Sequence, residues 1–141
     1  MKMGKREERL AAIRRIVRAH EVRTQAELGR LMREAGFECT QATISRDIAD
    51  LGLEKRSRGR GYALPEEAQF ERMVVSAESA GNIAVVKTLA GAAQGLALIV
   101  DEAAFDGVLG TVAGDDTIMI VGRTPEVAAE VAAYIDAHKR S

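Results

Sequence analysis

The chain has 141 residues, of which 47% are hydrophobic and 4% aromatic, which is enough for one domain or two small ones with a mainly aliphatic core. Its apolar runs are far too short for a membrane span, its N-terminus does not resemble a signal peptide, and its single Cys39 excludes an internal disulfide, so we expect a cytoplasmic protein. Residues 1–64 carry 15 Lys and Arg against 9 Asp and Glu, a net charge of +6, whereas residues 65–141 carry 5 against 12, a net charge of −7. This asymmetry predicts two domains, and it makes the basic domain a candidate for binding a polyanion.

The first 51 residues predict three helices. Apolar residues recur at helical spacing over 5–20, among many arginines. Thr24 followed by Glu27 forms a capping box that opens a second helix, which Gly36 ends. Thr40 is a suitable N-cap for a third helix, TQATISRDIADL, with Gly52 at its C-terminal end. Helix, short connection and helix is the order of a helix-turn-helix.

The third helix carries apolar residues on one face, at Ile44, Ile48 and Leu51. Its other face is small, polar and cationic. Arg can bond guanine, Gln can bond adenine, and Ser or Thr can bond phosphate or base, so this face suits a DNA major groove. The alternative is an ordinary solvated helix. The predicted DNA contacts on this helix are Gln41, Thr43, Ser45 and Arg46.

Residues 53–64 predict a small hairpin, because apolar residues flank a turn that contains glycine. Three helices followed by a basic hairpin make a winged helix, whose cations would lie on phosphates or in the minor groove. A flexible basic loop is the alternative. The predicted wing contacts with DNA are Arg56, Arg58 and Arg60, beside Lys55.

The charge changes sign at Pro65, so we interpret residues 65–72 as a linker or a short helical turn. Strands are expected at 73–77, 83–89, 108–113 and 117–121, with helices at 91–103 and after Thr124-Pro125. The predicted class is therefore α+β, with a winged helix-turn-helix over 1–64 and a two-layer ββαββα domain over 73–141. Such a small domain needs burial between subunits, and the apolar helix 91–100 is the expected interface.

Two adjacent carboxylates, Asp115 and Asp116, occupy a turn bounded by glycine. Ordinary turn chemistry explains such a pair. The functional alternative is a cation site, because two ionised neighbours favour a bound positive group. A guanidinium matches carboxylates in two parallel bonds, whereas the turn lacks the further oxygens that a hard metal needs, so no metal site is predicted.

Two long stretches resemble the arginine repressors of bacteria, which are regulators of arginine metabolism. TQAELGRLMREAGFECTQATISRDIADLGLEK resembles their winged-helix signature. GNIAVVKTLAGAAQGLALIVDEA, with GVLGTVAGDDTIMIV after it, resembles their C-terminal signature. The resemblance runs from about residue 8 to residue 135. It implies binding to inverted-repeat operators in double-stranded DNA, with L-arginine as corepressor, by trimers that pair into hexamers.

The resemblance also implies residue roles. Asp115 and Asp116 would meet the guanidinium of arginine, whereas Asp101 and Gln94 would hold its α-amino or carboxylate end. Ser45 and Arg46 match positions of the recognition helix. The full set of implied arginine contacts is Gln94, Asp101, Thr111, Ala113, Asp115 and Asp116. The sequence departs from the family in a short, Arg-rich wing, in Gly95 where a bulkier residue is common, and in Cys39 where Val is.

Two other classes of function remain open from the residues alone. An amino-acid-binding enzyme, or a regulatory subunit of one, would fit the C-terminal half, but no nucleophile–base pair is recognisable and no catalytic residue is predicted. A binder of structured RNA would fit the basic half. The interpretation that we favour is an arginine-dependent transcriptional repressor that is not an enzyme.

Overall fold

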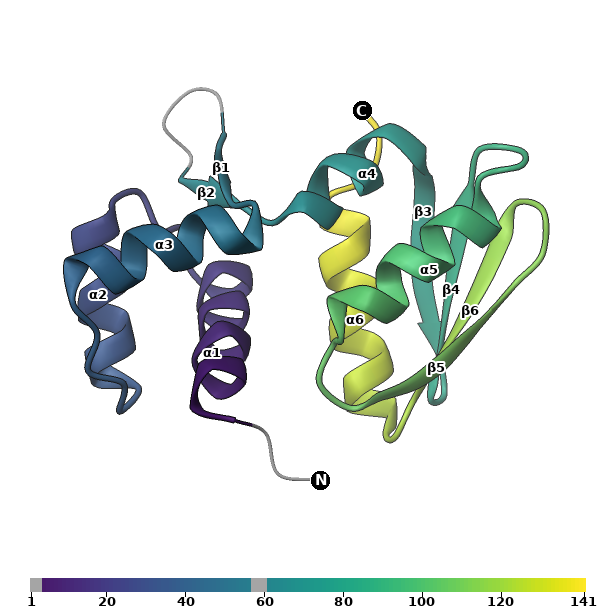
Figure 1. Cartoon of the computed structure of the whole chain (residues 1–141). Helices are drawn as coiled ribbons and strands as arrows, with labels where there is room; N and C mark the ends of the chain where they lie inside the picture. The colour runs from purple at the N-terminus through teal and green to yellow at the C-terminus, as the bar shows by residue number, and fades with distance from the viewer. Residues whose placement is uncertain (1–3, 57–60) are drawn as a thin grey trace. The chain divides into compact units, whose positions relative to one another are not determined.

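The computed structural model describes residues 4–56 and 61–141, and these form two compact units, Met1–Pro65 and Glu66–Ser141 (Figure 1). The first unit is helical with a small hairpin, and the second is a sheet with helices, so the predicted α+β class is confirmed. Among the described residues, no helix is both long and apolar enough to cross a membrane.

The first unit consists of α1 (Lys5–Ala19), α2 (Gln25–Glu34), α3 (Gln41–Leu51), β1 (Glu54–Lys55) and β2 (Tyr62–Ala63). The predicted caps are present. Thr24 Oγ1 accepts from the backbone N–H of Glu27 at 3.1 Å, and Thr40 Oγ1 accepts from that of Thr43 at 3.1 Å. Gly52 ends α3 in the left-handed region, with φ of 67°. The core lies between the three helices and the hairpin, and its fully buried side chains include Ile13, Val22, Leu28, Met32, Ile44 and Leu64.

The second unit begins with α4 (Pro65–Met73), so the segment predicted as a linker is helical from its first residue. It continues with β3 (Val74–Ala80), β4 (Ile83–Thr88), α5 (Ala93–Ala103), β5 (Val108–Ala113), β6 (Thr117–Gly122) and α6 (Pro125–Ala137). β3 runs three residues beyond the predicted strand end, because Ala80 pairs with Ile83 and leaves only Gly81 and Asn82 in the turn.

The four strands form one antiparallel sheet in the order β3-β4-β6-β5. α5 packs against β5 and β6, and α6 packs against β3 and β4, on the same face of the sheet (Figure 1). This arrangement is the expected two-layer domain. α4 is joined to α6 by a partly buried contact, in which the Tyr134 hydroxyl donates to the Glu67 carboxylate, and by the edge-to-face packing of Phe70 on Tyr134.

The other face of the sheet carries apolar side chains toward the outside. Val85 lies opposite Met119, and Met119 lies opposite Val112, so the three form one row across three strands. Val112 is 68% exposed and Met119 is 42% exposed. Val121 and Ile83 form a second, half-buried row beside it. We call these five residues the open sheet face.

Candidate functional site

The outer face of α3 is exposed as the sequence predicted. Gln41, Ser45 and Arg46 are all exposed, whereas Ile44, Ile48 and Leu51 are buried in the core. Thr43 differs from the other predicted contacts, because it is half-buried and its hydroxyl lies 3.0 Å from the hydroxyl of Thr40. Thr43 therefore supports the start of the helix.

One buried charge on this helix, Asp47, was not predicted from the sequence. Asp47 is 1% exposed, and Arg9 of α1 binds its carboxylate in a fork: Nε donates to Oδ2 at 2.6 Å and Nη2 donates to Oδ1 at 3.0 Å. One turn further along, Arg6 Nη2 donates to Asp50 at 3.1 Å in an exposed pair. The signal in the sequence is an aspartate at a core-facing position of a helix, which is stable only with a partner.

The predicted hairpin is present, and β1 pairs with β2 so that Lys55 lies opposite Tyr62. The backbone N–H of Arg56 donates to the carbonyl of Gly61 at 2.8 Å, and that of Tyr62 donates to Val22 at 2.7 Å. Gly61 has φ of 86°, and a Cβ there would lie 2.4 Å from the Val22 carbonyl oxygen, so only glycine fits. Among the predicted wing contacts Arg56 is half-buried, whereas Arg58 and Arg60 lie outside the described residues.

Cys39 precedes α3 and packs half-buried against the core of the first unit. Burial raises the pKa of its thiol above the ordinary value, so the thiol is protonated at neutral pH. This agrees with a packing residue and not with a nucleophile.

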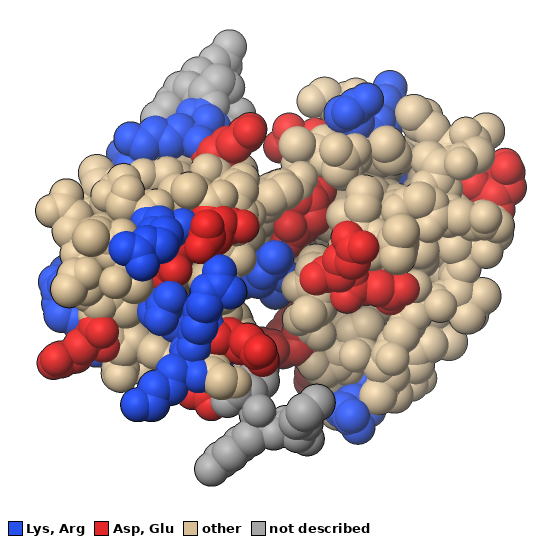
Figure 2. All heavy atoms as spheres, viewed as in Figure 1, with Lys and Arg blue, Asp and Glu red and all other residues tan. Residues whose placement is uncertain are grey.

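Basic side chains gather over the helical unit. Figure 2 shows Lys and Arg spread across that unit, whereas few lie on the visible face of the sheet-containing unit. The asymmetry predicted from the sequence is therefore also a surface property, and it gives the first unit the field that attracts a polyanion.

The two turn carboxylates lie beside the start of α5. The backbone carbonyl of Asp115 accepts from Ala93 at 3.2 Å, and that of Asp116 accepts from Thr88 at 2.8 Å. Both side chains are exposed, and so is Gln94, the second residue of α5. Asp116 Oδ1 accepts from the hydroxyl of Thr117 at 3.0 Å. The backbone of the turn is thus anchored, while the carboxylates and the Gln94 amide remain accessible.

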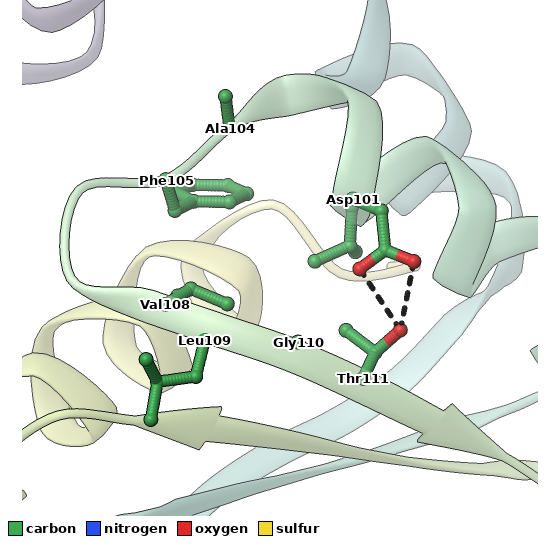
Figure 3. A pocket seen from close by; sticks show the side chains of 8 residues that line it. Asp101, Ala104, Phe105, Val108, Leu109, Gly110 and Thr111 are labelled. Atoms are coloured by element: carbon green, nitrogen blue, oxygen red, sulfur yellow. Dashed lines mark hydrogen bonds between the residues drawn. The ribbon is translucent and has the colours of Figure 1, made fainter. Parts of the chain in front are cut away.

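Asp101 and Thr111 form a second polar group, at the other end of α5. The Thr111 hydroxyl lies 3.0 Å and 3.1 Å from the two Asp101 carboxylate oxygens, to which it donates (Figure 3). They border an open pocket of about 420 Å³ between α5 and β5. The pocket is lined by Val100, Asp101, Ala104, Phe105, Val108, Leu109, Gly110 and Thr111.

Five of the six residues expected to bind arginine fall into two groups within one chain, and the sixth, Ala113, lies between them. Gln94, Asp115 and Asp116 lie at the first turn of α5, and Asp101 with Thr111 lies toward its end, next to the pocket. Gln94 and Asp101 are seven residues apart on one exposed side of the helix, which is about 10 Å along its axis. Ala113 is half-buried on β5.

Comparison with known proteins finds matches for both halves of the chain. The family described as "Arginine repressor, DNA binding domain" matches residues 4–70, and "Arginine repressor, C-terminal domain" matches residues 70–137. The "Arginine repressor" of Thermus thermophilus is 45% identical, over 89% of this chain and 85% of the relative. That of Carboxydothermus hydrogenoformans is 44% identical, over 86% and 90%. That of Halothermothrix orenii is 42% identical, over 79% and 87%. The chain therefore belongs to the arginine repressor family, and it is an arginine-responsive, DNA-binding transcriptional repressor and not an enzyme.

Proposed function

We propose that this repressor reads inverted-repeat operators in double-stranded DNA with the outer face of α3 and holds their phosphates with the wing. The support is the exposed row of Gln41, Ser45 and Arg46 above a well-packed inner face. Side chains of this kind can bond base edges, whereas wing cations contact phosphates without reading sequence. The proposed wing contacts are Arg56, Arg58 and Arg60, with Thr43 at the start of the helix as a further backbone or base contact.

L-arginine is the proposed corepressor, and its site is completed between subunits. The observation that carries this is the separation of the four exposed polar residues, with Gln94, Asp115 and Asp116 at one end and Asp101 about 10 Å away along α5. An amino acid with a guanidinium at one end has two charged ends that need such separated partners. Asp115 and Asp116 would bind the guanidinium, while Gln94, Asp101, Thr111 and Ala113 would hold the remainder, in part from a neighbouring subunit.

Assembly into trimers that pair into hexamers would cover apolar surface that the single chain exposes. The open sheet face is one such surface, and Leu98 of α5, which is 60% exposed, is another. The expected interface helix uses most of its apolar residues within its own subunit, where Leu96, Ala97 and Val100 are buried. The open sheet face therefore becomes the larger candidate. The proposed compartment is the cytoplasm, where operator DNA and free arginine meet.

Calorimetry of L-arginine binding tests the proposed ligand site, with sedimentation velocity run on the same samples. Asp116→Asn keeps the shape of the side chain and removes its charge. It should weaken arginine binding by about 2 kcal/mol or more, roughly 30-fold, because a desolvated ion pair loses one partner. Added arginine should shift the wild type to a faster-sedimenting, larger species, whereas the sedimentation of this variant should change less.

Asp106→Asn is the matched control, because Asp106 is an exposed carboxylate in the loop after α5, outside both groups. It should bind arginine like the wild type. Free L-lysine should bind poorly to the wild type and to both variants, since its ammonium group lacks the planar fork of a guanidinium. Equal affinity of Asp116→Asn and wild type would remove the turn from the site, and a wild type whose sedimentation ignores arginine would break the link to assembly.

A further inference from the structure

A charged fork between Arg9 and Asp47 joins α1 to α3. The Asp47 side chain is 2% exposed, and both of its carboxylate oxygens accept hydrogen bonds from Arg9. The hydrogen bond to Asp47 raises the pKa of Arg9 above its already high ordinary value, so the guanidinium remains charged. The fork is neutral as a whole, and Arg9 is not free to contact a phosphate while it holds Asp47.

Stability alone does not require such a fork. Replacing a buried ion pair by apolar side chains of similar volume is often neutral or stabilising, because removing two charges from water is costly. The other inner residues of α3, Ile44, Ile48 and Leu51, already bury its apolar side. A charged pair at this position therefore needs another explanation. What the ion pair adds to apolar packing is a fixed orientation of α3.

Apolar packing tolerates small rotations that a forked ion pair does not. Burial of apolar area has no preferred direction, whereas two parallel N–H···O bonds hold a planar group at two points. A side chain reaches about 5–6 Å from the helix axis, so a roll of about 20° moves its tip by about 2 Å. Hydrogen bonds to a base edge accept a range of only about 0.5 Å, so such a roll is enough to lose them.

We infer that Arg9 and Asp47 are positioning residues for sequence recognition, which set the rotation of α3 about its own axis so that Ser45 and Arg46 meet the base edges. Asp47 directly follows Arg46 in the helix, so a rotation fixed at Asp47 is transmitted to Arg46 with no intervening flexible segment. This inference rests on the proposed DNA-contacting face of α3.

The Arg6–Asp50 pair provides a matched comparison. It joins the same two helices one turn away, but its side chains are 60% and 41% exposed, and it has a single hydrogen bond at 3.1 Å. Exposed pairs of this kind contribute little and constrain little. Removing either pair leaves the net charge of the protein unchanged.

The experiment compares the full-length double variants Arg9→Met/Asp47→Leu and Arg6→Met/Asp50→Leu with the wild type, in excess L-arginine. The probes are the duplex that the wild type selects from a random-sequence pool and a shuffled duplex of the same composition. The readout is the ratio of the two dissociation constants, measured beside the melting temperature and the salt dependence on the shuffled duplex.

Arg9→Met/Asp47→Leu should melt cooperatively and bind shuffled DNA as the wild type does, with the same salt dependence. Its discrimination ratio should fall about tenfold or more, as expected when one specific base contact is lost. Arg6→Met/Asp50→Leu should keep the ratio of the wild type. Retention of the wild-type ratio by the folded Arg9→Met/Asp47→Leu variant would overturn the inference, because a merely structural pair leaves recognition intact.

Arg9→Lys decides the matter if the buried double variant fails to fold. It keeps the charge beside Asp47 and removes the planar fork, so it should remain folded and still lose discrimination; an unchanged ratio would overturn the inference. Arg46→Ala, run alongside, tests the contact face itself. An unchanged ratio in Arg46→Ala would remove the proposed face and the inference with it, whereas a loss there with no loss in the Arg9 variants counts against the positioning role alone.

Discussion

Buried or anchored carboxylates join elements that are distant in the sequence. Asp47 holds Arg9, and Glu67 accepts from the Tyr134 hydroxyl while its second oxygen lies 3.6 Å from Nε2 of His138. Asp136 of α6 accepts from the backbone N–H of Ala77 on β3 at 3.0 Å. Each carboxylate faces donors from another element, because a charge removed from water needs hydrogen bonds to replace the lost hydration.

Asp136 makes the stability of the sheet-containing unit depend on pH. The hydrogen bond from Ala77, with a smaller contribution from Lys139, lowers the pKa of Asp136 below its usual 3.8. Because the folded-state pKa lies below the unfolded one, ionised Asp136 stabilises the fold above that pH, and the contribution is lost as the pH falls through the folded-state pKa. Asp136→Asn should therefore lower the melting temperature at pH 7.

The difference in melting temperature between Asp136→Asn and wild type should narrow as the pH falls below about 4. Thermal melting followed by circular dichroism from pH 7 toward pH 3 measures it. Asp106→Asn, in an exposed loop, serves as control. A difference that stays constant down to the lowest pH would show that the charge of Asp136 has no part in the effect.

At the scale of elements, α3 depends on its cap, because the first four N–H groups of a helix have no partner within the helix. The Thr40 side-chain oxygen Oγ1 accepts a hydrogen bond from the backbone N–H of Thr43. Thr40→Ala should destabilise the protein by about 1 kcal/mol, and it should loosen the turn that contains Gln41. Urea unfolding measures the change. Thr40→Ser keeps the hydroxyl and should behave like the wild type; a Thr40→Ser loss as large as that of Thr40→Ala would argue for packing of the Thr40 methyl group and against the cap.

The wing and the recognition helix should respond differently to substitution. Arg58 belongs to the wing, whose proposed contacts are phosphates, so Arg58→Ala should weaken binding to every duplex alike. The slope of log K against log salt concentration should become shallower by about one unit. Titration of selected and shuffled duplexes at several salt concentrations measures both. If only the selected duplex were bound more weakly, Arg58 would be reading a base.

At the scale of the whole molecule, the open sheet face exposes apolar side chains that the described residues of its own unit do not cover. Val112→Lys places a charge on the β5 edge of that face without changing the inner core, since Val112 is 68% exposed. The variant should sediment as a smaller species than the wild type while keeping its secondary structure, because burying an unpaired ammonium between subunits is costly. It should also bind operator DNA more weakly, since fewer winged helices would act together.

Ala129→Lys is the control for Val112→Lys. Ala129 is exposed on α6, on the helical layer and away from the open sheet face, and the substitution adds the same charge. Equal sedimentation of Val112→Lys and wild type would exclude the open sheet face as an interface.

Local signals in the sequence determined most of the elements and the family. Capping threonines at 24, 40 and 124 begin helices as predicted, and β5 and β6 lie where strands were expected, on either side of the turn that contains Asp115 and Asp116. These signals work because a cap, a turn or a periodic face involves residues only a few positions apart. The outer face of α3 followed from the same spacing.

Only the tertiary structure decided which distant residues meet. The partners in the Arg9–Asp47 fork are 38 positions apart, and those in the Glu67–Tyr134 contact are 67 apart. Their pairing depends on how whole helices pack, which periodicity within one helix does not specify. The exposure of Val112 and Met119 has the same origin: alternation shows that a strand has two faces, but the placement of α5 and α6 on one of them leaves the other open.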